Sequence, residues 1–256
     1  MSSYKELFSR NLGFITELEQ EKIKRNQILL IGCGLGSQIA ILVARTGFTR
    51  FILCDGDVVE IHNINRQAFS QNHLGRNKAE ALRDLILEIN PEAEIEVYSQ
   101  FIKEEKVIRG LVRKSDIIVN MADPTESFYL IERIARNERK STIHPLNYGF
   151  GGWVLVITSE SPSIEEILGG CPIGFEFYQQ LIQKTGGLNR FPPYFIEFIE
   201  KYNELTEGSY TFPQLGIAAY LNSALIVTIA IRLTLGLPLK IAPEPITLDV
   251  FALTSC

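Results

Sequence analysis

Short apolar runs alternate with amphipathic segments along the first 158 residues of the chain. Residues 28–31 and 50–54 are continuous apolar runs, of the length typical of buried parallel strands. Residues 38–46 lie between them, and both this segment and residues 78–89 carry apolar positions at helical spacing. The pattern therefore predicts a strand, a helix and a second strand at the start of an α/β sheet.

The alternation continues after residue 89, where Asn90-Pro91 ends the helical pattern. Further strands are expected at residues 94–99, 116–123, 141–147 and 152–158. Further helices are expected at residues 103–112 and 125–137. We therefore predict a Rossmann-like, doubly wound α/β fold with a mostly parallel sheet.

The texture of the sequence divides the chain into four parts. The first part, residues 1–26, is a polar N-terminal arm and helix, and Thr16 is the expected N-cap of that helix. The third is an irregular, partly helical insertion with amphipathic segments, expected to cover the site or to contact the substrate. The boundaries are 1–26 for the arm, 27–158 for the nucleotide-binding core, 159–212 for the insertion, and 213–256 for an apolar helix and a closing strand that complete the same domain.

Residues 215–235 form an apolar stretch that approaches the roughly 20 residues needed to cross a membrane. Asn222 and Arg232 interrupt it, and its small residues suit close helix packing. We therefore predict a buried core helix or a dimer-interface helix and no membrane span. Residues 246–249 are the expected closing strand.

Composition sets the class of protein. The 256 residues include 46% hydrophobic and 21% charged residues, which is typical of a globular protein. A net charge of −5 argues against broad binding to nucleic acid or to anionic membranes. The polar N-terminus is not a secretory signal, and four scattered cysteines suit reduced thiols, so we expect a cytoplasmic protein.

A glycine turn and an acid mark the first candidate site. Gly32, Gly34 and Gly36 follow the first strand, and Asp55 ends the second. Glycines let backbone N–H groups approach phosphates at a helix N-terminus, and the acid can bind ribose hydroxyls. Taken alone, this unit favours NAD or FAD. Asp55 could instead cap a helix.

The next residues favour a triphosphate. Arg66 lies in the segment Asn63-Ile64-Asn65-Arg66-Gln67, and Lys78 follows Gly75-Arg76-Asn77. A guanidinium and an ammonium group can hold oxyanions and a departing pyrophosphate, which a dehydrogenase does not require. Two structural alternatives stay open: Arg66 paired with Glu60, and Lys78 as a solvated helix residue.

This block closely resembles the ThiF/MoeB/HesA family, the adenylating domain shared with ubiquitin-activating enzymes. The family pattern is G-x-G-G-x-G, then D-x-D-x-V-E-x-x-N-x-x-R-Q, a lysine after a glycine, and an aspartate after the fourth strand, here Asp123. The resemblance implies ATP-dependent adenylylation of a carboxylate, giving an acyl adenylate and pyrophosphate. It implies that Asn63 anchors the nucleotide, that Arg66 and Lys78 bind phosphates, and that Asp123 places Mg²⁺. It also implies a homodimer in which Arg10 reaches the partner's nucleotide site, although Arg10 could be a solvated surface residue.

The chain departs from the family pattern in three respects. Its glycine turn is one residue shorter, so the phosphate cradle should differ. The paired C-x-x-C motifs of many members are missing, so no structural zinc is expected. Cys171 lies in a Gly-Gly-Cys-Pro loop where some members hold an acyl-accepting cysteine. No activating partner is evident near it, so we expect an inert thiol.

Several carboxylates are compatible with this chemistry. We favour a peptide or small protein, such as a ribosomally made peptide-natural-product precursor modified at its C-terminus or at Asp/Glu side chains. The alternatives are the C-terminus of a sulfur-carrier protein and a modified tRNA adenosine that is dehydrated; the acidic balance lowers the tRNA option. A different class, an NAD-binding redox enzyme or sensor, would leave Arg66 and Lys78 unexplained.

Overall fold

The computed structural model describes residues 4–187, 190–205 and 212–254. Its centre is a seven-stranded sheet in the order β3-β2-β1-β4-β5-β6-β7. The first five strands along the chain run parallel, while β6 pairs antiparallel with β5 and β7 pairs antiparallel with β6. The strands are β1 (Gln27–Ile31), β2 (Arg50–Cys54), β3 (Glu94–Tyr98), β4 (Ile117–Asn120), β5 (Ser141–Tyr148), β6 (Gly151–Ile157) and β7 (Ile246–Asp249). The predicted Rossmann-like, mostly parallel sheet is confirmed.

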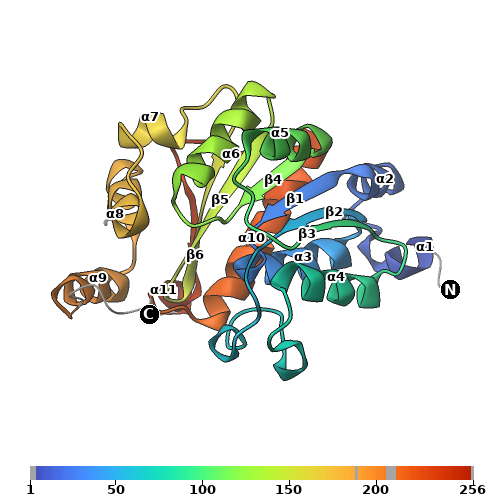
Figure 1. Cartoon of the computed structure of the whole chain (residues 1–256), viewed down its shortest axis with the longest axis horizontal. Coiled ribbons are helices and arrows are strands. Elements are labelled where there is room, and N and C mark those ends of the chain that lie inside the picture. The colour runs from blue at the N-terminus through green and yellow to red at the C-terminus, as the bar shows by residue number, and fades with distance from the viewer. Residues whose placement is uncertain (1–3, 188–189, 206–211, 255–256) are drawn as a thin grey trace.

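Helices cover both faces of the sheet (Figure 1). On one face lie α3 (Gly34–Thr46), α4 (Lys78–Ile89) and α10 (Gly216–Leu235), and on the other α5 (Glu105–Lys114) and α6 (Glu126–Asn137). Strand β1 shows why this arrangement buries it completely. Its Ile28 and Leu30 belong to the core under α3 and α10, and its Leu29 and Ile31 to the core under α5 and α6. Alternate side chains of one strand thus supply two hydrophobic cores.

The N-terminal arm packs beside α3. It consists of α1 (Tyr4–Leu7), the short 3-10 helix η1 (Ser9–Asn11) and α2 (Glu17–Arg25). The predicted cap of α2 is confirmed: the Thr16 side chain accepts from the backbone N–H of Glu19, whose carboxylate accepts from the N–H of Thr16. This reciprocal capping box satisfies two donors that a helix start leaves unpaired.

Two predicted boundaries are wrong in an informative way. Helix α3 begins at Gly34, four residues before the expected position 38, because Gly32 alone turns the chain with a φ of +93°. Strand β4 ends at Asn120, so Asp123 lies in the loop after the strand rather than on it. As a result, the beginning of α3 and the loop that carries Asp123 lie at the same edge of the sheet.

The insertion is partly helical, as expected. Its described helices are α7 (Ile164–Leu168), α8 (Gly174–Lys184) and α9 (Pro193–Leu205). Their apolar side chains pack with Trp153 and Leu155 of β6 into a third core, so the insertion extends from the far half of the sheet. After α10 the chain returns to the sheet as β7, and α11 (Val250–Thr254) follows.

Helix α10 is the one helix of the described residues that is long and apolar enough to cross a membrane. It packs instead against α3, β5 and β6, and its Ile226 and Ala230 are buried in the main core. Asn222 is also buried and donates to the backbone oxygen of Leu146. The prediction of a core helix is confirmed, and its exposed side includes Ile217 and Tyr220.

Candidate active site

The order of the strands fixes where a ligand can bind. Strand β1 lies between β2 and β4, so the chain winds outward in opposite directions from its two sides. In such sheets a crevice opens at the carboxyl ends of the two central strands. The residues that follow β1, β2 and β4 meet at this edge: the glycine turn, Asp55 and Asp123.

The glycine turn is tightly enclosed. A Cβ atom at Gly32 would lie 2.9 Å from the backbone oxygen of Met121, and one at Gly36 would lie 2.8 Å from its side-chain Cε. At Gly34 the added atom would lie 3.1 Å from Nε2 of Gln67. Glycine therefore allows the backbone at the start of α3 to approach its neighbours and a ligand, and the unpaired N–H groups of this helix start favour an anion.

Asp55 is held by backbone N–H groups. Its Oδ2 accepts from Cys33 at 2.6 Å and its Oδ1 accepts from Asp57 at 2.8 Å. Burial raises the pKa of Asp55, and the two backbone hydrogen bonds and the charge of Lys78 oppose that rise. The alternative of a helix-capping role is thus partly correct, because Asp55 accepts from the N–H of Cys33, the residue before α3. It also lines a pocket beside the turn.

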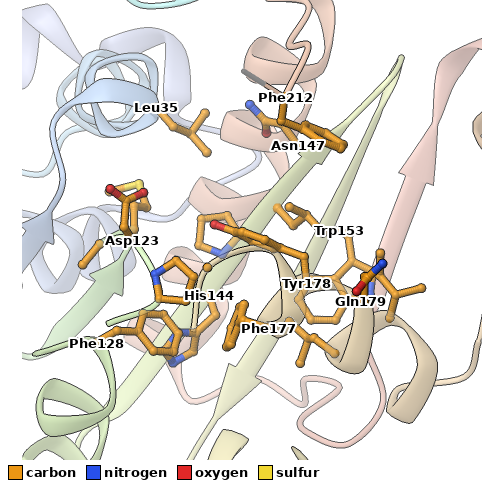
Figure 2. A pocket seen from close by; sticks show the side chains of 18 of the residues that line it. Leu35, Asp123, Phe128, His144, Asn147, Trp153, Phe177, Tyr178, Gln179 and Phe212 are labelled. Atoms are coloured by element: carbon orange, nitrogen blue, oxygen red, sulfur yellow. The ribbon is translucent and has the colours of Figure 1, made fainter. Parts of the chain in front are cut away.

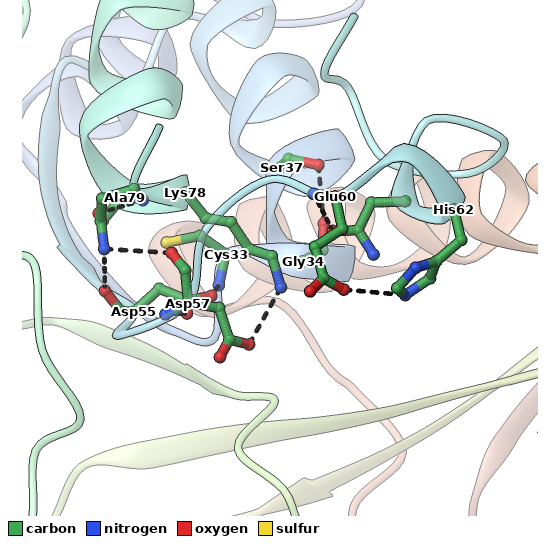
Figure 3. A network of polar contacts seen from close by, with 11 residues as sticks. Cys33, Gly34, Ser37, Asp55, Asp57, Glu60, His62, Lys78 and Ala79 are labelled. Atoms are coloured by element: carbon green, nitrogen blue, oxygen red, sulfur yellow. Dashed lines mark hydrogen bonds and ion pairs between the residues drawn. The ribbon is translucent and has the colours of Figure 1, made fainter. Parts of the chain in front are cut away.

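Lys78 is the first residue of α4 and is not a solvated lysine. Its side chain is only 10% exposed, and Nζ lies 3.0 Å from Oδ2 of Asp57 (Figure 3). Asn77 caps the helix with its Oδ1 and donates through Nδ2 to the backbone oxygens of Asp55 and Asp57. This network fixes the ammonium group at the pocket beside the glycine turn.

Arg66 does not pair with Glu60. Its Nε donates to Oε1 of Gln214 at 2.9 Å, and its Nη1 donates to the backbone oxygen of His62 at 2.7 Å and to Oδ1 of Asn65. Burial lowers the pKa of the guanidinium. Asn63 is buried and accepts from the backbone N–H of Glu60, so it holds the shape of this loop.

Two adjoining cavities occupy the edge of the sheet. The smaller, of about 390 Å³, is lined by Gly32, Gly34, Asp55, Asp57 and Lys78. The larger, of about 1200 Å³, includes Arg66 and extends under the insertion (Figure 2). Both are lined by Leu35, Met121, Ala122, Asp123 and Thr125, and Asp123 is exposed to them. The structure therefore places all the expected site residues of this edge around two cavities that meet at Asp123, except Gly36 and Asn63, which support the walls.

The donor set suits a Mg²⁺–nucleotide better than a protein-held metal. No group of three His, Cys, Asp or Glu residues that could hold a metal occurs in the described part of the chain. Mg²⁺ bound to phosphates usually needs only one or two carboxylates and keeps waters. Asp123 and Asp57, which both line the smaller pocket, meet that requirement.

Arg10 lies away from this edge. It belongs to η1, where the neighbouring Asn11 donates to the backbone oxygen of Thr46 at the C-terminal end of α3. The glycine turn is at the other end of this 13-residue helix, about 20 Å away at 1.5 Å per residue. Within one chain Arg10 is therefore remote from the two cavities, and it is exposed.

Cys171 is exposed and lacks the surroundings of a nucleophile. The pKa of its thiol is raised, first by desolvation and next by its hydrogen bond to Glu165. Its loop nevertheless runs close to the site: Gly174 N–H donates to the backbone oxygen of Pro124, next to Asp123. Only a lowered pKa would indicate an activated thiol.

The walls of the larger cavity contain residues that the sequence did not reveal. Asn120 is the last residue of β4, and Asn147 is the last but one of β5. Their position near the carboxyl ends of these strands was the available signal. Gln214 and His144 carried no signal at all. Burial lowers the pKa of His144 to about 3, so it is neutral at physiological pH.

The fold and these cavities define a protein of the Rossmann-like class with a larger cavity beside the pocket at the glycine turn. The sequence matches the ThiF family over residues 8–254, and the chain belongs to that family. It is 31% identical over 137 residues to a probable molybdopterin-synthase adenylyltransferase of Porphyra purpurea, covering 53% of this chain and 36% of the relative. It is 39% identical over 90 residues to ubiquitin-like modifier-activating enzyme 5 of Caenorhabditis elegans, covering 35% of this chain and 21% of that relative. The chain thus spans about a third or less of these curated relatives.

Solved structures show the same fold. Selenomethionine PaaA superposes with a TM-score of 0.70 at 20% identity, over 98% of this chain and 81% of PaaA. Escherichia coli MccB with ATP superposes with a TM-score of 0.63 at 18% identity, over 96% of this chain and 69% of MccB. MccB with an N7-isoasparagine form of MccA gives a TM-score of 0.69 at 19% identity, over 97% and 69%.

Proposed function

We propose that the protein activates a carboxylate on a peptide or small protein by ATP-dependent adenylylation. The observation that carries the proposal is the junction of two cavities at Asp123, one suited to a nucleotide and one large enough for a second substrate. Support comes from the family, whose members include proteins named adenylyltransferases, and from the structural neighbour MccB, which was solved with ATP and with MccA.

In the proposed reaction a carboxylate oxygen attacks the α-phosphorus of ATP. A new bond forms between the carboxylate oxygen and the α-phosphorus. The bond between the α-phosphorus and the oxygen that bridges to the β-phosphate breaks, and pyrophosphate leaves with the electron pair. Lys78 and Arg66 stabilise negative charge on the phosphates, and the amides at the start of α3 add to it. Mg²⁺, when bound, neutralises phosphate charge, and Asp123 with Asp57 would hold it. The main contribution of the protein is to align two anions.

The nucleotide roles follow from position. Asp55 would bind ribose hydroxyls from the end of β2, and Gly32, Gly34 and Gly36 would allow the backbone to approach the phosphates. Lys78 also argues against the NAD-binding alternative, because a buried cation paired with Asp57 suits a highly charged phosphate chain. The test is the midpoint temperature of thermal unfolding of the protein, measured with each nucleotide. ATP with Mg²⁺ should raise it and NAD should not; a rise with NAD alone would overturn the proposal.

We further propose a cytoplasmic homodimer with composite sites. The N-terminal arm packs at the far end of α3, so Arg10 can act on a nucleotide only if it belongs to another subunit. The exposed apolar residues Ile217 and Tyr220 of α10 suit an interface between two copies. A monomeric mass at working concentrations, by light scattering, would contradict this part.

The adenylate is proposed to leave the enzyme without passing to a thiol. Cys171→Ser should then retain most activity, since the serine keeps the size and polarity of the side chain. Transfer to the enzyme would instead give a thioester, visible in the intact mass of the wild type and lost in Cys171→Ser. That result would favour the sulfur-carrier alternative, which shares the adenylation step.

A further inference from the structure

The larger cavity is lined mainly by the insertion and by the far half of the sheet. Helix α9 supplies Phe195 and Ile199. Helix α8 supplies Phe177 and strand β6 supplies Trp153, both labelled in Figure 2. Its volume of about 1200 Å³ exceeds the range of about 300 to 1000 Å³ that is usual for small-molecule sites. The cavity therefore has room for more than a carboxylate: it can hold several residues of a substrate.

The charge along the cavity is uneven. Of the described residues that line it, only Arg66 and Asp123 carry a formal charge, and Asp123 lies at the end shared with the nucleotide pocket. The remainder is aromatic, aliphatic or neutral polar. Away from Arg66 and Asp123, a charged substrate side chain would lose its hydration without meeting an opposite charge among the described lining residues. An apolar side chain carries no such cost.

Neutral polar atoms in the wall have no partner. Oε1 of Gln67, Nδ1 of His144 and Nδ2 of Asn147 are buried without a hydrogen bond, in residues that are 7%, 3% and 7% exposed. All three residues line the cavity. Buried polar atoms are normally paired, so these unpaired atoms are available to a ligand once their side chains turn toward the cavity. Amide oxygen, amide nitrogen and imidazole together match the donors and acceptors of a peptide backbone.

We propose that this cavity binds the uncharged, apolar segment of a peptide next to the carboxylate that is adenylylated. The inference rests on the proposed function and narrows its substrate class. Large hydrophobic side chains would occupy the wall of Phe177, Phe195 and Trp153, while Gln67, His144 and Asn147 would pair with the peptide backbone. The reacting carboxylate would then lie at the Asp123 end.

Trp153 allows a direct test, because it is the single tryptophan of the chain and lines the cavity. We would titrate the whole protein, without nucleotide, with Ala-Phe-Phe, Ala-Lys-Lys and Ala-Glu-Glu and follow tryptophan fluorescence. Burying one large apolar side chain favours binding by about tenfold or more. Ala-Phe-Phe is therefore expected to bind at least about tenfold tighter than either charged peptide. Equal affinities, or a preference for a charged peptide, would overturn the proposal.

A matched pair of substitutions locates the site. Ile199 and Ile196 are both half-buried on α9, but only Ile199 lines the cavity. Ile199→Glu should weaken Ala-Phe-Phe at least about tenfold, and Ile196→Glu should leave it unchanged. If either glutamate variant fails to fold, Ile199→Ala and Ile196→Ala give the same comparison with a smaller loss. Equal effects of the pair would contradict the placement.

Pyrophosphate release with ATP and Mg²⁺ separates this inference from the proposed function. Selective binding of Ala-Phe-Phe with no release from any carboxylate would refute adenylation and leave the apolar cavity standing. Release that is equally fast with all three peptides would support adenylation and refute the apolar preference.

Discussion

The Nε atom of Arg66 lies 2.9 Å from Oε1 of Gln214, and this contact joins the loop after β2 to the segment that leads into α10. Asn65 strengthens the same junction, because its Nδ2 donates to the backbone oxygen of Gln214. Both Arg66 and Gln214 line the larger cavity. The guanidinium that is proposed to stabilise phosphate charge is thus oriented by a residue nearly 150 positions away in the sequence.

Arg66→Ala should retain the fold and lower carboxylate-dependent exchange of pyrophosphate into ATP by about 100-fold or more, as expected for a lost oxyanion contact. Gln214→Ala should lower it by about tenfold, because the guanidinium loses its orientation. Gln214→Glu, which keeps an acceptor at the same place, should restore most of the rate. The control is Gln71→Ala, an exposed residue of η3 (Gln71–His73) that lines neither cavity. An unchanged rate in Arg66→Ala would remove it from the mechanism.

The glycine turn gives a prediction about stability. Gly32→Ala places a Cβ 2.9 Å from the oxygen of Met121 at a φ of +93°, so the free energy of unfolding should fall by about 2 kcal/mol or more. Gly110→Ala is the control, since Gly110 lies inside α5 with nothing within 4 Å of its added Cβ. That variant should gain about 0.5 to 1 kcal/mol. Denaturant unfolding measures both, and equal changes would contradict the turn geometry.

Sequence patterns predicted the strands of the sheet and the grouping of the glycine turn, Asp55 and Lys78, because each of these depends on a short stretch of sequence. Strand β1, the glycine turn, Asp55 and Lys78 lie within about 50 residues, and each carries a type of residue that its role requires. The wall of the larger cavity was beyond reach, because His144, Trp153 and Gln214 meet only after β5, β6 and α10 have packed. A buried histidine or a loop glutamine has no pattern of its own.

Glu132 gives a prediction about pH. It is 2% exposed on α6, and burial raises its pKa from 4.5 to about 7, although Oε1 accepts from the backbone N–H of Ile164. The folded state therefore binds the proton more tightly than the unfolded state. Stability from this group is complete below pH 4.5 and is lost as the pH rises through about 7, by about 3 kcal/mol.

Glu132→Gln should remove this dependence and raise the free energy of unfolding at pH 8, because the amide keeps an oxygen for Ile164. Glu126→Gln, at an exposed position of the same helix, should leave the pH profile unchanged. Urea unfolding between pH 4 and pH 8 measures the three proteins. A profile of Glu132→Gln that parallels the wild type would show that this carboxyl group does not titrate as described.

Composite sites predict complementation between two inactive variants. In a mixture of Arg10→Ala and Asp123→Ala subunits, a heterodimer contains one site with an intact Asp123 and an intact partner arm. Random exchange should then recover roughly a quarter of wild-type exchange activity. Each variant alone should stay inactive. The control is Arg25→Ala, at an exposed residue of α2: in place of Arg10→Ala in the mixture, it should behave as the wild type does. No recovery, despite subunit exchange shown by mass, would contradict the role of Arg10.

In the proposed mechanism one pocket binds ATP, and the adjoining cavity presents a carboxylate to it across Asp123. The most direct measurement is incorporation of radiolabelled pyrophosphate into ATP, with Ala-Phe-Phe and with its C-terminal amide. Exchange is expected with the free carboxylate, none with the amide, and none with Asp123→Ala, while Glu126→Gln should exchange as the wild type does. Exchange that is independent of a carboxylate, or that persists at full rate in Asp123→Ala, would contradict it.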